Sequence, residues 1–323
     1  MIISCKNCAS KFNVNETFIR ESGSRVRCSL CKRVFTIQRP STTKDKVIQK
    51  EIAQIKKEPS PVLKHPCRII SISNQKGGVS KTTTCLNLGA SLAMLNWRVL
   101  MIDFDVQASL TGALGYQNTR SFYDVIHSDY DFSSCILNTK YARLDLLPSD
   151  ENMILLDRRY FFDRAGANFF EYMLKDRLAD LVGGRLKNKY DYILIDTPPS
   201  VGYFVLNSLT AAHFIIIPCQ SEYLSARGVG QTVKLINRVK RNTNPQVQAR
   251  ILVTMYDPDC TASKLVVSKL KGSYRGMTFK TVINHDVKIR ESQIMKEPVY
   301  YYDKHSQAAL QYFALAKEIG GKF

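Results

Sequence analysis

The 323-residue sequence lacks the features that would place a protein in or across a membrane. It has no run of about 18 consecutive apolar residues, the length that a membrane-spanning helix requires. Its N-terminus, MIISCKNCASKF, also lacks the basic segment followed by an apolar stretch that is typical of a secretion signal. We therefore expect a cytoplasmic protein with no membrane partner.

Acidic residues are scarce, since 28 Asp and Glu stand against 46 Lys and Arg and give a formal net charge of +18. The excess is densest in residues 1–66, which hold 14 basic and 5 acidic side chains. A basic surface attracts polyanions through its long-range field and through the release of condensed counterions. The charge balance favours nucleic acid as a partner, and the alternative is that the charge only keeps the protein soluble.

The nine cysteines do not indicate a disulfide scaffold, because the cytoplasm keeps thiols reduced. Four of them form two pairs, Cys5-x-x-Cys8 and Cys28-x-x-Cys31, separated by nineteen residues. Two such pairs offer four thiolates to one tetrahedral Zn²⁺, and metal binding would supply the folding free energy of so small a module. We predict a structural zinc site. A thioredoxin-like redox role is the alternative, but it needs only one pair, in a strand–helix context.

Composition divides the chain into three segments. Residues 1–38 form the cysteine-bearing module, which we predict to be a zinc ribbon. Residues 39–66 are rich in Pro, Ser, Thr and Lys, as expected of a basic linker, and a short helix within it stays an open question. Residues 67–323 form the main domain.

In the main domain, short apolar runs alternate with longer segments of helical spacing. The expected strands lie in residues 67–73, 97–104, 144–149, 190–196, 213–219, 250–256 and 279–283. Helical spacing is found in residues 82–96, 231–241 and 305–323. This alternation predicts an α/β fold, a mostly parallel sheet with helices on both faces and ligands at the carboxyl ends of the strands.

The most specific motif is SISNQKGGVSKTTT, residues 71–84, which joins the first expected strand to the first expected helix. The usual G-x-x-x-x-G-K-[ST] pattern fails, because Gln75 and Ser80 occupy its glycine positions. Gly77 and Gly78 still allow a tight turn whose successive N–H groups face phosphate oxygens. The following helix offers its positive N-terminal end to the same anion. We predict a nucleotide site.

Lys81 and Thr82 stand where P-loop proteins hold the terminal phosphates and Mg²⁺. Lys81 is expected to reach the β- and γ-phosphates, and the Thr82 hydroxyl to bind Mg²⁺. A glycine turn with a chance lysine is the alternative, and the additional Lys76 argues against it. The expected nucleotide-binding residues are Lys76, Gly77, Gly78, Val79, Ser80, Lys81, Thr82 and Thr83.

The arrangement Lys-Gly-Gly-x-x-Lys-Thr at residues 76–82 resembles the deviant Walker A motif of the ParA and MinD ATPases. In that family a signature lysine contacts phosphate across a dimer interface, a role that the resemblance gives to Lys76. Most members carry glycine where Ser80 stands, so this chain departs from the family there.

Two later segments resemble the family in the right order. Residues 99–111 resemble its Walker A′ segment, with Asp103 and Asp105 present and Val106 in place of the usual proline. The resemblance implies that Asp105 helps to orient the attacking water and that Asp103 lies near Mg²⁺.

Residues 190–200 resemble the Walker B strand, which ends at Asp196. The resemblance implies that Asp196 is linked to Mg²⁺ through water. Lys76, Lys81 and Asp105 then form the expected catalytic set, with ATP and Mg²⁺ as cofactors.

The resemblance implies an ATP-driven positioning switch. ATP binding closes a homodimer that holds DNA without sequence preference on the nucleoid, and slow hydrolysis, stimulated by a ParB-like partner, releases it. The cargo is a chromosome, a plasmid or a protein cluster. The resemblance places a DNA-contacting surface near Lys288 and Arg290.

Two other functions stay open. One is a regulator whose zinc ribbon binds DNA or protein while the nucleotide is structural. The other is a MinD-like division-site ATPase, although residues 305–323 read as a terminal core helix and not as a membrane-targeting one. Residues 1–38 also resemble a small zinc ribbon found at the N-termini of bacterial proteins, with Lys6 in place of the expected proline.

Overall fold

The computed structural model describes residues 2–14, 24–37, 67–117, 119–127, 132–156, 158, 170–183 and 189–320. The chain separates into two compact units, Met1–Ala53 and Gln54–Phe323. The expected linker at residues 39–66, with the question of its helix, lies outside the described residues. No helix in the described ranges combines the length and the apolar character needed to cross a bilayer.

The smaller unit contains two antiparallel hairpins. Strand β1 (Ile2–Ser4) pairs with β2 (Lys11–Asn13), and β3 (Ser24–Arg27) pairs with β4 (Val34–Ile37). Their inner faces share one small apolar cluster, formed by Ile3, Phe12, Val14, Val26, Phe35 and Ile37. So small a core is consistent with a module that depends on metal for its stability.

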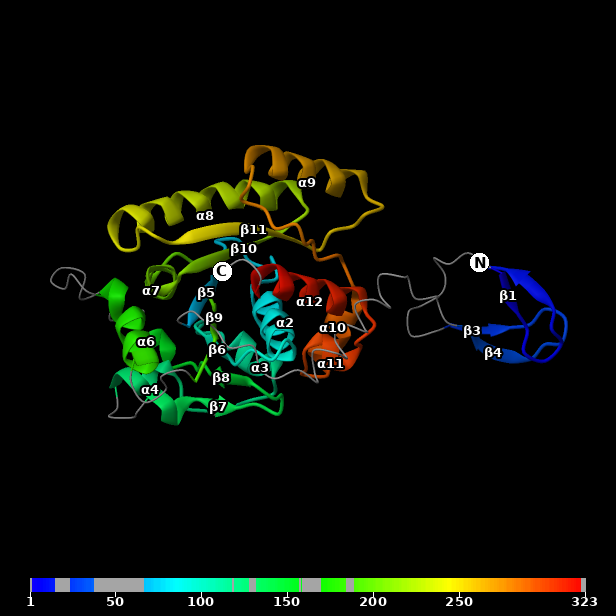
Figure 1. Cartoon of the computed structure of the whole chain (residues 1–323), viewed down its shortest axis with the longest axis horizontal. Coiled ribbons are helices and arrows are strands. Elements are labelled where there is room, and N and C mark those ends of the chain that lie inside the picture. The colour runs from blue at the N-terminus through cyan, green and yellow to red at the C-terminus, as the bar shows by residue number, and fades with distance from the viewer. Residues whose placement is uncertain are drawn as a thin grey trace. The chain divides into compact units, whose positions relative to one another are not determined.

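A seven-stranded sheet forms the centre of the larger unit (Figure 1). In sheet order the strands are β11 (Gln248–Thr254), β10 (Phe214–Gln220), β5 (Arg68–Ile72), β9 (Tyr192–Asp196), β6 (Val99–Asp103), β8 (Leu144–Leu147) and β7 (Leu137–Asn138). Every neighbouring pair is parallel except β7 and β8. The predicted α/β fold with a mostly parallel sheet is confirmed.

One face of the sheet carries α2 (Lys81–Met94), which packs against α12 (Gln307–Gly320) (Figure 1). The residue Gly89 allows α2 to approach the sheet closely, because a Cβ there would lie 2.8 Å from the Met101 sulfur of β6. Helix α12 is buried along its length, as expected of a terminal core helix.

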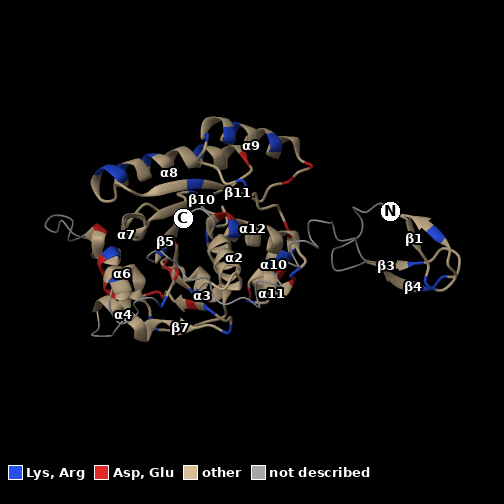
Figure 2. Cartoon of the chain, viewed as in Figure 1, with Lys and Arg blue, Asp and Glu red and all other residues tan. Residues whose placement is uncertain are grey.

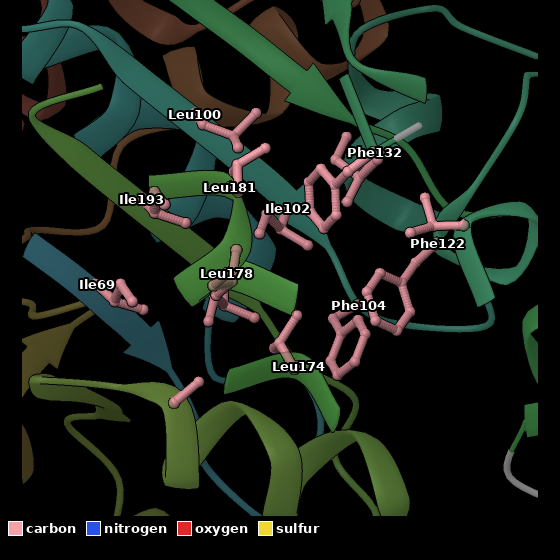
Figure 3. Packing of buried hydrophobic residues seen from close by; sticks show 14 of the residues in the cluster. Ile69, Leu100, Ile102, Phe104, Phe122, Phe132, Leu174, Leu178, Leu181 and Ile193 are labelled. Carbon is pink, nitrogen blue, oxygen red and sulfur yellow. The ribbon is translucent and has the colours of Figure 1, made fainter. Parts of the chain in front are cut away.

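The opposite face is covered by α4 (Phe122–His127), α6 (Met173–Gly183) and α7 (Tyr203–Ala211). Figure 3 shows leucines of α6 packed with strand residues of β6 and β9. These leucines recur at i, i+4 and i+7, so they form one apolar stripe. They are Leu174, Leu178 and Leu181.

Helices α8 (Tyr223–Asn242) and α9 (Thr261–Ser273) cover the end of the sheet formed by β10 and β11. Their buried residues join a second apolar cluster with both strands. The remaining short elements are α3 (Ser109–Ala113), η2 (Phe132–Cys135), η3 (Phe170–Tyr172), α10 (Val287–Ile294) and α11 (Val299–Tyr302).

The strand expected at residues 279–283 is wrong. That segment makes only isolated bridges to β11, and side chains of α12 take its backbone donors. The Glu318 carboxylate accepts the N–H groups of Lys280 and Thr281 at 3.0 Å each. A helix therefore satisfies the groups that a neighbouring strand would otherwise pair. The short edge strand β7 was not expected.

Candidate nucleotide site and metal centres

The loop after β5 is fastened at its start by the Asn74 side chain. The Asn74 amide donates to the Pro218 carbonyl of β10 at 2.7 Å. Its side-chain oxygen accepts the Thr232 hydroxyl of α8 and the Lys76 backbone N–H, each at 3.1 Å. A buried asparagine thus fixes the loop to two elements before its turn begins.

The glycine turn leaves an open hollow at the carboxyl edge of the sheet. A Cβ at either Gly77 or Gly78 would meet no atom within 4 Å, and Gly78 has a left-handed φ of +72°. The Gly78 carbonyl accepts from the Gln220 side chain at 2.8 Å, and the Val79 carbonyl from Thr254 at 3.3 Å. Because a trans peptide points its N–H opposite its C=O, the donors of these units face away from β10 and β11. The loop fits an anion such as phosphate.

Ser80 begins α2 with a left-handed backbone, φ 70° and ψ 33°, and its side chain makes no capping hydrogen bond. Such a conformation suits glycine, the residue that most relatives carry here. A non-glycine residue in this conformation costs about 1 kcal/mol. The predicted departure at Ser80 therefore places strain inside the phosphate loop.

Lys81 lies at the base of the hollow with a side chain that is nearly inaccessible to solvent. Its ammonium donates to the Lys76 carbonyl at 3.1 Å. Burial lowers the pKa of Lys81, and the carboxylates of Asp196 and Asp105 act in the opposite direction. The structure therefore brings the predicted phosphate-binding lysine together with two of the predicted acidic residues.

Asp196 and Asp103 end adjacent strands, and their Cα atoms are register partners. Both side chains are fully buried. Neither carboxylate oxygen of Asp196 has a hydrogen-bond partner of normal geometry in the described residues. Burial, followed by repulsion from Asp103, raises the pKa of Asp196 well above its ordinary value, while Thr82 and Lys81 oppose the rise.

Asp103 is better satisfied than Asp196. One of its oxygens accepts the N–H and the hydroxyl of Thr111 at 2.8 and 2.7 Å. Burial nevertheless raises the pKa of Asp103 to about 6, and the Thr111 hydrogen bonds only partly offset it. A position near Mg²⁺, without direct ligation, suits a carboxylate whose oxygens are already engaged.

These residues fit Mg²⁺. A buried carboxylate with two unpartnered oxygens is costly unless a cation or donor compensates it. Asp196 stands beside a second carboxylate and the Thr82 hydroxyl, and such hard oxygen ligands, with water, are those that Mg²⁺ prefers. Mg²⁺ bound here would bridge and neutralise phosphate oxygens.

Asp105 closes the turn that follows β6. Its carboxylate accepts the Gln107 N–H at 3.0 Å, and its carbonyl accepts the Ala108 N–H at 2.9 Å and the Ser149 hydroxyl at 2.6 Å. This side-chain turn orders the loop although Val106 replaces the family's proline. Asp105 is almost fully buried and faces the Lys81 charge.

Lys76 is placed apart from Lys81. Its ammonium donates to the Ser225 hydroxyl at 2.7 Å and lies 4.0 Å from the Glu222 carboxylate, at the start of α8. Within one chain, the signature lysine therefore rests on α8, and Lys81 is the lysine directed into the carboxylate cluster.

Sequence reasoning missed Asn74, Gln220 and Thr254, which shape the loop. Each is a polar residue at or just beyond the carboxyl end of a buried strand. That position was the available signal, because parallel strands bring their carboxyl ends to the same edge of the sheet.

The four predicted zinc ligands meet in the smaller unit. Their sulfur atoms all lie within 4.8 Å of one another, with 3.5 Å between Cys5 and Cys31 and 3.6 Å between Cys8 and Cys28. A tetrahedron with Zn–S bonds of about 2.3 Å has sulfur atoms about 3.8 Å apart. The arrangement fits one Zn²⁺.

The two cysteine turns have the same backbone design. Ala9 donates to the Cys5 carbonyl and Lys32 to the Cys28 carbonyl, and both residues have left-handed backbones. The N–H groups of Asn7 and Cys31 lie 3.5 and 3.4 Å from the Cys5 and Cys28 sulfurs. Such N–H donors stabilise metal-bound thiolates.

We expect about one Zn²⁺ per chain in the purified protein, because the four thiolates form a single closed tetrahedral site. Elemental analysis measures this content, and a shortened chain that begins at Cys67 is the control. The shortened chain should lose its zinc and keep a folded sheet, since its core lies within the larger unit. Zinc retained by the shortened chain would place the metal elsewhere.

The expected DNA-contacting residues on α10 differ in their surroundings. The Lys288 ammonium is 2.7 Å from the Glu291 carboxylate and 5.6 Å from the centre of the Tyr302 ring. The Glu291 partner raises the pKa of Lys288. Arg290 is exposed. The charge of Lys288 is therefore compensated within the chain, and Arg290 is the more accessible of the two.

Comparison with known proteins adds an independent finding. A family described as an AAA domain matches residues 67–249, and one described as a zinc-ribbon domain matches residues 1–36. The chain is 35% identical over 263 residues to the sporulation initiation inhibitor protein Soj of Bacillus subtilis, a match that covers 78% of this chain and 98% of Soj. It is 33% identical over 256 residues to the chromosome partitioning protein ParA of Myxococcus xanthus, covering 78% of this chain and 87% of that protein.

Solved structures show the same fold. Cobyrinic acid a,c-diamide synthase from Mycobacterium smegmatis, with bound ADP and magnesium, has a TM-score of 0.65 and 32% identity, covering 78% of this chain and 93% of that one. The cell division ATPase MinD of Pyrococcus furiosus has a TM-score of 0.63 and 23% identity, covering 79% of this chain and 98% of that one.

Proposed function

The chain belongs to the ParA/Soj family of P-loop ATPases, with an added N-terminal zinc ribbon, and from this premise we propose that it is a DNA-bound positioning switch. In this proposal ATP closes a homodimer on nucleoid DNA without regard to sequence. Slow hydrolysis, stimulated by a ParB-like partner, releases the DNA. The cargo is a chromosome, a plasmid or a protein cluster.

One observation carries the proposal of turnover. The open glycine hollow, the buried Lys81 and the unpartnered Asp196 carboxylate meet at one edge of the sheet, beside Asp105. A nucleotide held only for structure needs the phosphate loop but not an additional, nearly buried carboxylate that faces the phosphate-binding lysine. The arrangement therefore favours hydrolysis over a structural nucleotide.

The position of Lys76 supports a role outside its own site. Its ammonium is held by Ser225 and Glu222 in the single chain, away from the carboxylates that surround Lys81. We propose that ATP-driven dimerisation releases Lys76 from Ser225 and directs it to the phosphates of the second subunit. The exchange replaces one polar contact by a charge-assisted one, which favours the closed dimer.

The DNA surface of the larger unit extends, in our proposal, beyond Arg290 to helix α8. Residues 223–242 contain no acidic side chain, and exposed cations recur along the solvent face at helical spacing. Helix α9, which packs beside α8, also carries lysines and no acidic residue. Figure 2 shows this run of basic residues along both helices. On α8 the exposed cations are Arg227, Lys234, Arg238 and Arg241.

Changing Lys234 and Arg238 together to Gln should weaken DNA binding by the ATP-bound protein about tenfold or more, since each lost phosphate contact also lowers the log–log salt slope by about one unit. Dimerisation doubles the loss, because each subunit presents its own row. Fluorescence anisotropy with unrelated duplexes, in ATP and in ADP across a salt series, measures the effect. Nucleotide affinity should not change.

The matched control is Lys175→Gln with Arg177→Gln on α6, where two exposed cations alternate with Asp176 and Asp180. The control should retain affinity within about threefold, since its cations are already offset by neighbours. Equal affinity in ATP and ADP for the unmodified protein would contradict the switch and favour the regulator with structural nucleotide. Pelleting with liposomes in ATP would instead support the MinD-like alternative.

A further inference from the structure

The zinc ribbon carries basic side chains without acidic ones throughout its described part. Residues 2–14 and 24–37 contain no Asp or Glu, as Figure 2 also shows. Their six cations are all exposed to solvent, and they are Lys6, Lys11, Arg25, Arg27, Lys32 and Arg33. The cysteine site accounts for none of them, and the proposed switch does not use them.

These cations are distributed unequally between the two hairpins. In β3 the side chains alternate, so that Val26 faces the apolar cluster while Arg25 and Arg27 face solvent. Their partners across the hairpin, Thr36 and Val34, are exposed on the same outer face. The first hairpin presents one cation on its outer face, Lys11 of β2.

The second cysteine turn adds two more cations to the same hairpin. Lys32 donates its N–H to the Cys28 carbonyl, and the Arg33 carbonyl accepts from the Cys28 N–H. Both residues therefore sit in the turn that directly follows Arg27. Four of the six cations thus belong to the β3–β4 hairpin and its cysteine turn, and we call this set the basic hairpin: Arg25, Arg27, Lys32 and Arg33.

The basic hairpin has the shape and chemistry to bind duplex DNA. A two-stranded β-ribbon is narrow enough to enter the major groove. Residues i and i+2 of a strand lie about 7 Å apart on one face, so Arg25 and Arg27 form a row of two guanidinium groups. Guanidinium forks bind phosphate oxygens through two hydrogen bonds each.

We propose that the basic hairpin is a second DNA contact, one that binds the phosphate backbone in every nucleotide state. It goes beyond the proposed switch, because its residues form a compact unit of their own and none belongs to the nucleotide site. The contact would hold the chain near DNA after ATP hydrolysis has opened the dimer. Because both contacts are on one chain, the weak one raises the local concentration of DNA for the other.

An acidic protein segment is the competing ligand, and the exposed Leu30 beside the hairpin is the feature that would suit it. The outer face of β3 and β4 favours DNA instead. It carries two arginines with a threonine and a valine across from them, and no large apolar side chain for an amphipathic partner to cover.

The test uses the full-length protein in ADP at low salt, with the anisotropy of fluorescent duplexes of unrelated sequence. Arg25→Gln with Arg27→Gln should lower DNA affinity about tenfold or more and reduce the salt slope by one to two units, roughly one per lost contact. The control, Lys6→Gln with Lys11→Gln, removes the same charge from the first hairpin and should change affinity less than about threefold. Unchanged zinc content in both variants shows that the ribbon is intact.

Three outcomes would overturn the proposal. They are no DNA binding in ADP, equal losses in the two variants, and displacement of DNA by poly-glutamate as efficiently as by unlabelled DNA of equal charge. The last outcome would assign the basic hairpin to an acidic protein partner. In ATP, the gain in affinity over ADP should persist in the Arg25/Arg27 variant and disappear in the Lys234/Arg238 variant, so the two contacts can fail separately.

Discussion

Replacing Lys81 with alanine is expected to abolish nucleotide binding, with a loss of affinity of at least about 100-fold, or roughly 3 kcal/mol. Lys81 is the nearly buried cation directed into the carboxylate cluster, where its charge offsets Asp196 and Asp105. Without it, the triphosphate would add negative charge to a site that already holds buried carboxylates. Titration with a fluorescent ATP analogue in the presence of Mg²⁺ measures the loss.

Lys76→Ala is the matched comparison, because it removes a lysine from the same loop. Its ammonium rests on Ser225 in the single chain, so nucleotide affinity should stay within about threefold of the unmodified protein. ATP-dependent dimerisation, measured by light scattering, and ATP hydrolysis should both be lost. If Lys81→Ala and Lys76→Ala both bind ATP normally, the assigned nucleotide site is wrong.

Asp105→Ala should lower the rate of ATP hydrolysis about 100-fold or more, the usual contribution of a residue that positions or activates the attacking water. ATP binding should persist, because the phosphate loop and Lys81 are intact. The expected product is a long-lived ATP-bound dimer that stays on DNA. Single-turnover hydrolysis, together with light scattering after ATP addition, measures both effects.

Asp105→Asn separates the charge of this residue from its structural role. An asparagine oxygen can still accept the Gln107 N–H that Asp105 accepts at 3.0 Å, so the turn after β6 should be retained. Slow hydrolysis by both variants would assign the effect to the carboxylate. Slow hydrolysis by the alanine variant alone would assign it to the turn, and normal hydrolysis by both would remove Asp105 from the mechanism.

The parts of this protein that the sequence determined are those encoded by local patterns. Continuous apolar runs predicted six of the seven strands of the sheet, because a strand buried on both faces needs apolar side chains on both. The glycine loop before a helix predicted the nucleotide site, and the spacing of four cysteines predicted the ribbon. In each case neighbouring residues in the chain carry the whole chemical signal.

The tertiary structure decided what depends on partners distant in sequence. Glu318 takes the backbone donors of residues 280 and 281, so an apolar run that looked like a strand is not one. Glu291 compensates Lys288, and the folding of α8 gathers its cations on one solvent face.

The acidic cluster shows the same division within one site. The sequence supplied Asp103 and Asp196 at the ends of two strands, but only strand order places them as register partners. Burial then leaves Asp196 without a hydrogen-bond partner in the described residues and raises its pKa. Sequence thus determined which groups are present, while packing decided which charges are compensated, because compensation depends on distance and burial and not on separation along the chain.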